Sequence, residues 1–382
     1  MTNLIAPLLW ATVVALVLWP RIAGRRLGFS VYVLTITINE LPLWFLVAIS
    51  FGIWAGADDR PDGAAGAAWI ALWAFVVGGL LWAQFRAGRA HPALWQALTA
   101  SWGEQRPEAD DVDRRRVLRA WLRGIALPFQ RRTPGVERTR DLSYGPDPAH
   151  ILDAYRGPRP GGGRPILIHF HEGGFIQGNK SRESVTLLNQ LAAHGWWCLS
   201  ANYRLRADAA WPNPLIDAKR AIAWAREHAA ENGADADQVF LAGGSAGGHM
   251  ALNAALTAGD PRFQPGFERA DTSVLAAVSL YGYLGGRSDD PASSPTDLAG
   301  ADSPPLLLIQ GANDTGMGAP IDTIRGWATK LQAKSAAPVV YAELPGAQHA
   351  FDLFASVRAR LTADAVEDFL RWARRQRLGT VE

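Results

Sequence analysis

The sequence predicts an α/β fold, in which helices cover both faces of a mostly parallel sheet, preceded by an N-terminal transmembrane helical region. Three observations lead to this prediction. The first 85 residues carry only eight charged side chains, a density typical of membrane segments. From about residue 165 onward, short apolar runs closed by glycine alternate with stretches of helical periodicity. The length of 382 residues allows two or three structural units.

The overall composition excludes several classes of protein. Hydrophobic residues make up 48% of the chain and charged residues 19%, which excludes an intrinsically disordered chain. The single cysteine, Cys198, excludes a scaffold held by disulfides. A formal net charge of +2 gives little attraction to nucleic acid, so we expect no nucleic-acid partner.

Three membrane spans are the simplest interpretation of the N-terminal region, near residues 3–20, 30–56 and 64–85. The middle span is the least regular, because Glu40 and Pro42 interrupt it, so its first part could instead enter the membrane and break there. Two spans are an alternative. A signal peptide over the first segment is another, although no basic residue precedes that segment.

Basic residues near the spans predict the orientation. Arg21, Arg25 and Arg26 follow the first span and Arg86 and Arg89 follow the third, whereas an acidic segment follows the second. The positive-inside rule then places the C-terminal bulk of the chain in the cytoplasm. We therefore expect a multi-pass protein of the inner or plasma membrane, with membrane lipids as partners and its catalytic part on the cytoplasmic side.

Three regions follow from these patterns: transmembrane helices over 1–88, a connector over 89–135 and a catalytic domain over 136–382. The connector is predicted to form a basic amphipathic helix, which could lie on anionic lipid or cap the domain that follows. Because the proposed spans hold none of the predicted chemistry, we expect the chain without residues 1–88 to stay folded, soluble and active.

The catalytic domain begins with a hairpin-like segment and continues with three glycine-closed strands, over 165–171, 239–243 and 305–311. Ligands of parallel sheets bind beyond the carboxyl ends of the strands. Each of these strands ends beside polar residues, which indicates a site at that edge.

The nucleophile candidate is Ser245, in the segment Gly243–Gly247. The pattern is G-x-S-x-G, in which small neighbours allow a sharp strand-to-helix turn that exposes the serine hydroxyl. The pattern alone is weak, because a glycine turn that caps a helix matches it too, but here it follows a predicted strand and precedes a predicted helix.

A serine hydroxyl needs a base, and the base needs an orienting carboxylate. Asp314 follows the strand 305–311, and His349 follows the later apolar strand VVYAEL. Both therefore fall at strand ends, in the order serine, acid, histidine. We predict that Ser245, Asp314 and His349 form a catalytic triad.

The segment HEGGF, at 171–175, supplies an oxyanion-binding loop. Its glycines allow backbone N–H groups to point at a developing negative charge. Gly173, Gly174 and the N–H of Ala246 are the predicted donors, while His171 is expected to be structural.

Together with NYRL and NPLIDAKRAIAW, the motifs HEGGF, GGSAGG, GAND and GAQHAF resemble the hormone-sensitive-lipase-like branch of the α/β-hydrolases, in particular membrane-attached bacterial carboxylesterases. The resemblance covers about 135–382. It implies an α/β-hydrolase fold and a serine carboxylesterase, lipase-like, that acts on a small-molecule or lipid ester and needs no cofactor. The oligomeric state stays open.

Two departures from the family pattern matter. Glu172 replaces the first glycine of H-G-G-G, and we expect its side chain to point away from the cleft, where a carboxylate would oppose the oxyanion. The segment after LYGYLGG is also short, so any cover over the site must come from the connector or from the membrane.

Rival functions are a membrane acyltransferase or an aryl-formamide hydrolase with the same triad, and a catalytically silent membrane scaffold. A metal site of His169, His171 and Glu172 is a weak alternative, because no further ligand cluster accompanies them, and no metal is expected.

Overall fold

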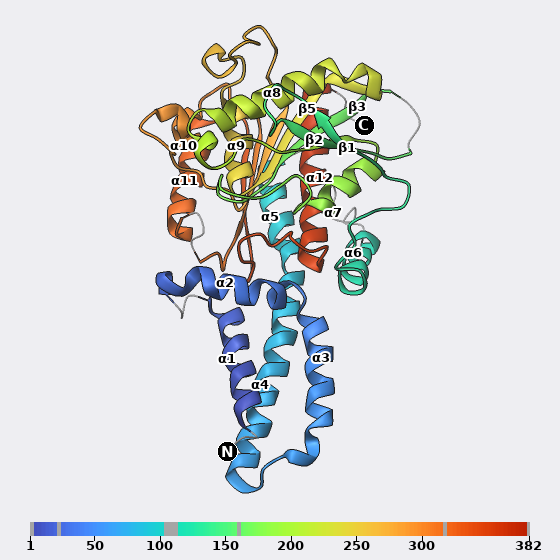
Figure 1. Cartoon of the computed structure of the whole chain (residues 1–382), viewed down its shortest axis with the longest axis vertical. Coiled ribbons are helices and arrows are strands. Elements are labelled where there is room, and N and C mark those ends of the chain that lie inside the picture. The colour runs from blue at the N-terminus through green and yellow to red at the C-terminus, as the bar shows by residue number, and fades with distance from the viewer. Residues whose placement is uncertain (1–3, 21–23, 103–113, 159–161, 316–318, 380–382) are drawn as a thin grey trace.

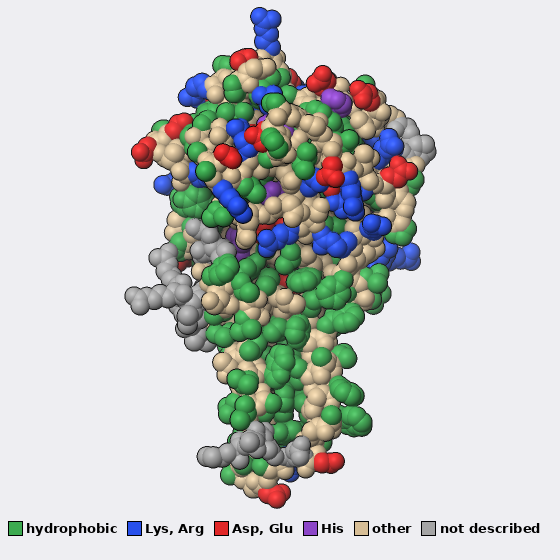
Figure 2. All heavy atoms as spheres, in the orientation of Figure 1, with side chains coloured by type: hydrophobic (Ala, Val, Ile, Leu, Met, Phe, Trp, Pro, Cys, Tyr) green, Lys and Arg blue, Asp and Glu red, His purple; other side chains and the backbone are tan. Residues whose placement is uncertain are grey.

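A computed structural model of the chain describes residues 4–20, 24–102, 114–158, 162–315 and 319–379. The N-terminal helices form a stalk, and most of the remaining chain forms a rounded head at one end of it (Figure 1). The visible surface of the stalk is largely hydrophobic, whereas charged side chains are scattered over the head (Figure 2).

Five helices build the stalk and its junction with the head. They are α1 (Ile5–Leu18), α2 (Gly24–Glu40), α3 (Pro42–Ala55), α4 (Gly63–Gly88) and α5 (Ala90–Trp102). The last two form a single helix of 40 residues that runs from the stalk into the head. In the described residues, it is the one helix long and apolar enough to cross a membrane by itself. α2 and α3 would make a second span only if the bent pair counts as one, and α1 is shorter.

The region expected to form the middle span, 30–56, is not one helix. α2 ends at Glu40 and α3 begins at Pro42, with a bend of 88° between the two axes. α2 crosses beneath the head, while α3 runs along the stalk (Figure 1). Proline favours the start of a new helix, because it lacks the N–H that a helix interior requires. The three-span interpretation therefore corresponds to one long helix, one bent pair and one short helix.

The head is built on one eight-stranded sheet with the order β1-β2-β4-β3-β5-β6-β7-β8. β1 and β2 pair antiparallel, β2 and β4 pair antiparallel, and every pair from β4 to β8 is parallel. The strands are Glu137–Ser143, Ile151–Arg156, Arg164–Phe170, Trp197–Ala201, Ala234–Gly244, Ala276–Leu280, Leu306–Gly311 and Val339–Leu344, from β1 to β8. The mostly parallel sheet predicted from the alternating pattern is therefore confirmed.

Helices cover both faces of the sheet, and each face has its own hydrophobic core. Leu167 of β3 packs into one core, and its neighbours Ile166 and Ile168 pack into the other, because side chains alternate along a strand. The helices that pack on strands of the sheet are α5, α7 (Val185–Ala193), α8 (Asn213–Glu227), α9 (Ala246–Leu256), α11 (Ile321–Lys334) and α12 (Val357–Leu378). α6 (Arg114–Ala126) packs on α12, and the short α10 (Pro295–Leu298) packs on α9 and α11.

The connector expected over 89–135 divides into two parts. The 88/89 boundary lies inside the 40-residue helix, and α5 buries Leu94 and Leu98 in the same core as Leu167. α6 packs on α12, as a cap helix would, and leaves leucine side chains exposed, as a helix on lipid would.

Candidate active site

Ser245 lies between the end of β5 and the start of α9, with φ 50° and ψ −113°. A positive φ is uncommon for a residue with a side chain, and it indicates local strain of the kind that clusters at functional sites. The serine N–H donates to the Leu280 carbonyl at 2.8 Å. Gly247 makes the turn possible, because a Cβ there would lie 2.0 Å from the Phe170 carbonyl oxygen. The predicted strand-turn-helix setting of the serine is present.

Asp314 and His349 meet at the carboxyl ends of β7 and β8. The Nδ1 atom of His349 lies 2.7 Å from Oδ2 of Asp314, and both side chains are buried. The Gln310 amide donates to the same carboxylate oxygen at 3.1 Å. With Nδ1 engaged by the carboxylate, Nε2 is the ring nitrogen that can exchange a proton.

Charge around His349 raises the pKa of its imidazole. Burial is the largest single effect, and alone it would lower the pKa of the imidazole, because it disfavours the charged form. The charge and hydrogen bond of Asp314, with smaller contributions from Glu172 and Asp352, outweigh burial and raise the pKa above its ordinary value. The imidazolium is therefore stabilised at this position.

The loop after β3 brings the predicted oxyanion donors to the same edge. Gly173 has φ 124°, and a Cβ there would lie 1.8 Å from the Gln177 carbonyl oxygen, so no larger residue fits. In the described part of the chain, the N–H groups of Gly173, Gly174 and Ala246 donate to no protein group. These three donors are available to a ligand.

Tyr281 connects the serine turn to the histidine. It follows β6, its hydroxyl lies 2.6 Å from the position of a Cβ on Gly244, and its ring centroid lies 4.8 Å from that of His349. Tyr281 was not predicted as a site residue. Its place after an apolar strand, in LYGYLGG, was the available signal.

Three acidic side chains lie buried behind this edge: Glu172, Glu183 and Asp352. Asp352 accepts hydrogen bonds from Tyr281 and from the Ser184 hydroxyl, each at 2.5 Å. Burial raises the pKa of Asp352, in opposition to these two hydrogen bonds. This group was not predicted, because Asp352, in the connection after β8, is far in sequence from Glu172 and Glu183, which both lie between β3 and α7.

Glu172 does not extend into solvent. Its carboxylate is buried and lies 3.5 Å from Arg182. Burial raises the pKa of Glu172, and the charges of His349 and Arg182 oppose part of that rise. The side chain that we expected to point away therefore lies close enough to His349 for the two charges to interact.

His171 packs between its own loop and Tyr203. Its Nδ1 lies 2.6 Å from the Glu172 carbonyl oxygen, and its ring stacks on the Tyr203 ring at 4.3 Å. Burial lowers its pKa to about 4, so the ring is neutral at physiological pH. Among the described residues, no three His, Cys, Asp or Glu side chains are grouped to hold a metal ion, His169 and His171 included.

The N-terminal helix α2 reaches the site. Thr35 Oγ1 and the Gln348 amide are hydrogen-bonded at 2.9 Å, and Asn39 donates to the Gly346 carbonyl at 3.0 Å. The Tyr32 ring lies 6.3 Å from the ring of His349. The cover expected from the connector or the membrane thus includes a helix of the N-terminal region, for which the sequence held no signal.

The chain is similar in sequence to known proteins. The probable carboxylic ester hydrolase LipM of Mycobacterium tuberculosis is 37% identical to the chain over 376 residues, which cover 88% of this chain and 84% of LipM. The chain belongs to the hormone-sensitive-lipase-like carboxylesterases. It is a carboxylic ester hydrolase, like the relatives that carry this name.

Further similarities between this chain and known proteins agree with the assignment to the esterases. Esterase LipQ of the same organism is 38% identical over 271 residues, which cover 63% of this chain and 64% of LipQ. The family model BD-FAE matches residues 152–285. The solved apo structure of Thermogutta terrifontis esterase 2 matches with a TM-score of 0.53 and 24% identity, over 62% of this chain and 94% of that one. The last likeness shows an α/β-hydrolase esterase fold.

Proposed function

We propose that the protein is a membrane-anchored esterase in which Ser245 is the nucleophile, His349 the general base and Asp314 the carboxylate that orients the histidine. The observation that carries the proposal is the 2.7 Å hydrogen bond between His349 and Asp314, at the same sheet edge as the strained turn of Ser245. A serine hydroxyl becomes a nucleophile only with such a base beside it.

The reaction has two acyl-transfer steps. His349 Nε2 takes the hydroxyl proton of Ser245 as its oxygen attacks the ester carbonyl, and then gives the proton to the leaving alcohol. Water, activated by the same imidazole, attacks the acyl-enzyme and releases the acid. Asp314 holds the ring with Nδ1 toward the carboxylate and stabilises the imidazolium in both steps.

The negative oxygen that forms in each step is bound by backbone donors. The N–H groups of Gly173, Gly174 and Ala246 have no protein acceptor in the described chain, so they can donate to an oxyanion without giving up another bond. Such preorganised donors are usually the largest electrostatic contribution to acyl transfer.

The stalk anchors the enzyme in a membrane. α4 has 26 residues and is therefore about 39 Å long, more than the ~30 Å hydrocarbon core of a bilayer. Large apolar side chains on the stalk are exposed, including Val47 (72%), Phe51 (68%) and Trp54 (74%). A hydrophobic surface of this kind is expected to be covered, and lipid chains would cover it on all sides. α1 and α3 would then lie in the bilayer beside α4.

The head stands on the cytoplasmic side of an inner or plasma membrane in this proposal. Lys and Arg side chains gather on the part of the head next to the stalk (Figure 2). The opposite end of the stalk carries the acidic residues Asp58 and Asp62 and one basic residue, Arg60, in the segment between α3 and α4. This distribution is the one that the positive-inside rule associates with a cytoplasmic head.

Ser245→Ala tests the chemistry. We expect the variant to lose turnover of p-nitrophenyl butyrate by several orders of magnitude, and to lose labelling by a fluorophosphonate, while it stays folded. Ser273→Ala, which changes an exposed serine outside the candidate active site, is the matched control. Release of free acid without an added alcohol distinguishes hydrolysis from acyl transfer. Turnover above a tenth of the wild-type rate in Ser245→Ala would reject the nucleophile.

Membrane anchoring needs a separate test. Membranes that contain the expressed protein are washed with alkaline carbonate and with high salt, and we expect the protein to stay in the pellet until detergent is added. Release by either wash would show that the stalk lies on a surface and does not span the bilayer.

A further inference from the structure

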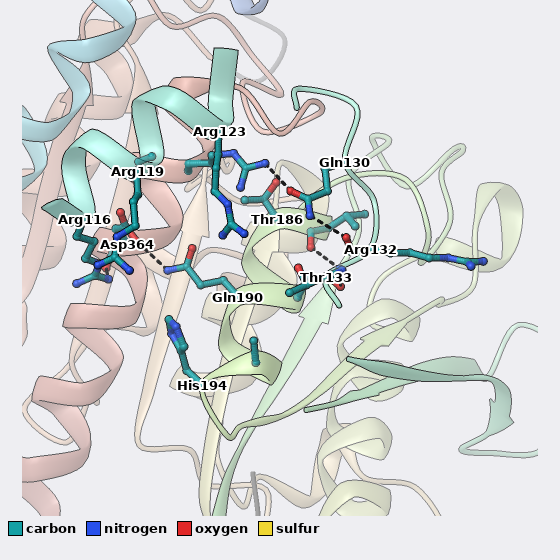
Figure 3. A pocket seen from close by; sticks show the side chains of 15 residues that line it. Arg116, Arg119, Arg123, Gln130, Arg132, Thr133, Thr186, Gln190, His194 and Asp364 are labelled. Carbon is teal, nitrogen blue, oxygen red and sulfur yellow. Dashed lines mark hydrogen bonds and ion pairs between the residues drawn. The ribbon is translucent and has the colours of Figure 1, made fainter. Parts of the chain in front are cut away.

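A groove opens between α6, α7 and the loop that follows α6, and no residue of the proposed triad lines it. Its volume is about 210 Å³. Arg116, Arg119 and Arg123 of α6 line one side, and Thr186 and Gln190 of α7 line the other (Figure 3). No step proposed above uses this groove.

The arginines around the groove differ in their partners. Arg116 is neutralised by Asp364 at 2.9 Å and by Asp368 at 2.7 Å. In the described chain, by contrast, no carboxylate lies within ion-pairing distance of Arg123 or Arg360. Arg123 reaches from α6 into the groove, whereas Arg132 extends away from it (Figure 3). The groove therefore has two cations that form no ion pair among the described residues. Asp364 also lines the groove, but it pairs with Arg116 and acts on Arg360 only from a longer distance.

Arg360 is held in place by neutral acceptors. Its Nη2 donates to Gln130 Oε1 at 2.9 Å, and its Nε donates to the Ala355 carbonyl at 3.1 Å. Its pKa is lowered to about 10, chiefly by burial and also by the nearby charge of Arg123, and the charge of Asp364 opposes part of this shift. Two like charges beside a cavity favour an anion between them, because it would relieve their repulsion.

Apolar side chains lie beside the arginines. Leu118 and Leu122 are exposed on α6, and Phe129 is exposed on the loop that follows. Trp44, from the start of α3, contacts this loop: its Nε1 donates to the Ile125 carbonyl at 2.8 Å, and its ring lies 5.9 Å from that of Phe129. The groove is thus joined to the top of the stalk by a hydrophobic surface.

We propose that this groove binds the phosphate of an anionic membrane lipid, with Arg123 and Arg360 as its ligands and the lipid chains along Leu118, Leu122 and Phe129. Guanidinium groups bind phosphate through paired N–H donors, and the exposed leucines suit an acyl chain better than water. The identification of the ligand as a lipid rests on the membrane anchoring proposed above, because the stalk would place the groove at the level of the lipid headgroups. The anion site itself does not depend on the triad.

The test uses the full-length protein in detergent and three soluble probes: dihexanoyl phosphatidic acid, dihexanoyl phosphatidylcholine and inorganic phosphate. Binding is measured by calorimetry. We expect phosphatidic acid to bind at least tenfold more tightly than either other probe. Equal affinity for inorganic phosphate would reject the lipid as the source of the anion.

Arg123→Gln and Arg132→Gln form a matched pair. Both arginines are exposed, both lie near the groove and both substitutions remove one positive charge. We expect Arg123→Gln to weaken phosphatidic acid binding at least tenfold and Arg132→Gln to change it less than twofold. Equal losses would mean diffuse attraction to a basic surface and would overturn the site.

Ser245→Ala separates this proposal from the proposed function. That variant should bind phosphatidic acid as the wild type does, and Arg123→Gln should hydrolyse a soluble butyrate ester at the wild-type rate. If Ser245→Ala kept its esterase activity, the triad would be wrong and the anion site would stand. If Ser245→Ala lost phosphatidic acid binding, the groove would belong to the substrate site, and the separate anion site would be rejected.

Discussion

The phenol ring of Tyr32 meets the imidazole of His349 edge-on, at an angle of 80° between the ring planes. Tyr32 belongs to α2, so a helix that precedes the hydrolase domain in sequence covers the side chain that would act as its base. Solvation of the imidazole thus depends on the N-terminal region, and Tyr32 provides a way to test the effect of this cover.

Tyr32→Ala should raise the pKa of His349. Burial of the imidazole lowers its pKa, so loss of the covering ring removes part of this effect and stabilises the charged form. Because the base must be neutral, the acid limb of kcat/KM against pH should move to higher pH. Tyr32→Phe keeps the ring and is the control. An unchanged limb in Tyr32→Ala would show that the ring does not shield the histidine.

Glu172→Gln should shift the acid limb of kcat/KM to lower pH, opposite to the shift expected for Tyr32→Ala. The Glu172 charge contributes to the raised pKa of His349, and its removal leaves the imidazolium less stabilised. The acid limb is therefore expected at lower pH, by up to about one unit. Asp208→Asn, which removes a charge from the head surface, should leave the profile in place. A shift to higher pH in Glu172→Gln would contradict the proximity of the two charges.

Asp314→Asn and Asp352→Asn together test which of these two carboxylates orients His349. An amide cannot hold the imidazole in the required tautomer, so kcat should fall by roughly 10⁴-fold with little change in KM. Asp352 contacts Tyr281 and Ser184 through its hydrogen bonds, so Asp352→Asn should lose far less activity. The opposite ranking of the two kcat values would make Asp352 the orienting acid.

Glu40→Ala should destabilise the whole protein. Glu40 pairs with Arg358, both side chains have 0% exposure, and Ser356 Oγ donates to the same carboxylate at 3.0 Å. Removal of one partner leaves a buried unpaired charge, which typically costs about 3–5 kcal/mol of unfolding free energy. Thermal unfolding in detergent measures this effect.

The double variant Glu40→Leu with Arg358→Met is the control for Glu40→Ala. It removes both charges and keeps the volume apolar, so most of the lost stability should return. If the double variant were as unstable as Glu40→Ala, packing of α2 and not the charge pair would hold the helix to the head.

The same pair bears on our expectation that the chain without residues 1–88 would remain folded and soluble. That deletion removes Glu40 and leaves Arg358 buried without its carboxylate. It also removes the α2 side chains bonded to Gln348 and Gly346. The truncated chain is therefore expected to be less stable than the full-length protein, because these contacts of the N-terminal region with the head would be lost.

The local sequence pattern was sufficient to predict most of the sheet edge that carries the candidate active site. Glycine-closed apolar runs predicted β3, β5 and β7, because strand ends depend on neighbouring residues. The prediction that Asp314 lies beside His349 followed from chain order and strand ends. It agrees with the hydrogen bond between the two side chains.

Contacts between distant segments were not predictable in this way. Glu40 looked like an ionisable group within a span, because its partner Arg358 lies in a helix near the C-terminus. Tyr32 and Thr35 looked like ordinary residues of an apolar segment, although Thr35 bonds a side chain 313 positions away. A single sequence holds no periodicity that signals such a pair.

The 40-residue helix from Gly63 to Trp102 limits which substrates the active site can reach. It is about 60 Å long, and its far end is packed inside the head, so the head cannot swing freely on a linker. If α4 stands in a bilayer, the catalytic edge is carried at a constant height above the leaflet. The enzyme would then search for substrate in two dimensions, along the membrane that holds it, and esters in a facing membrane would stay beyond its reach.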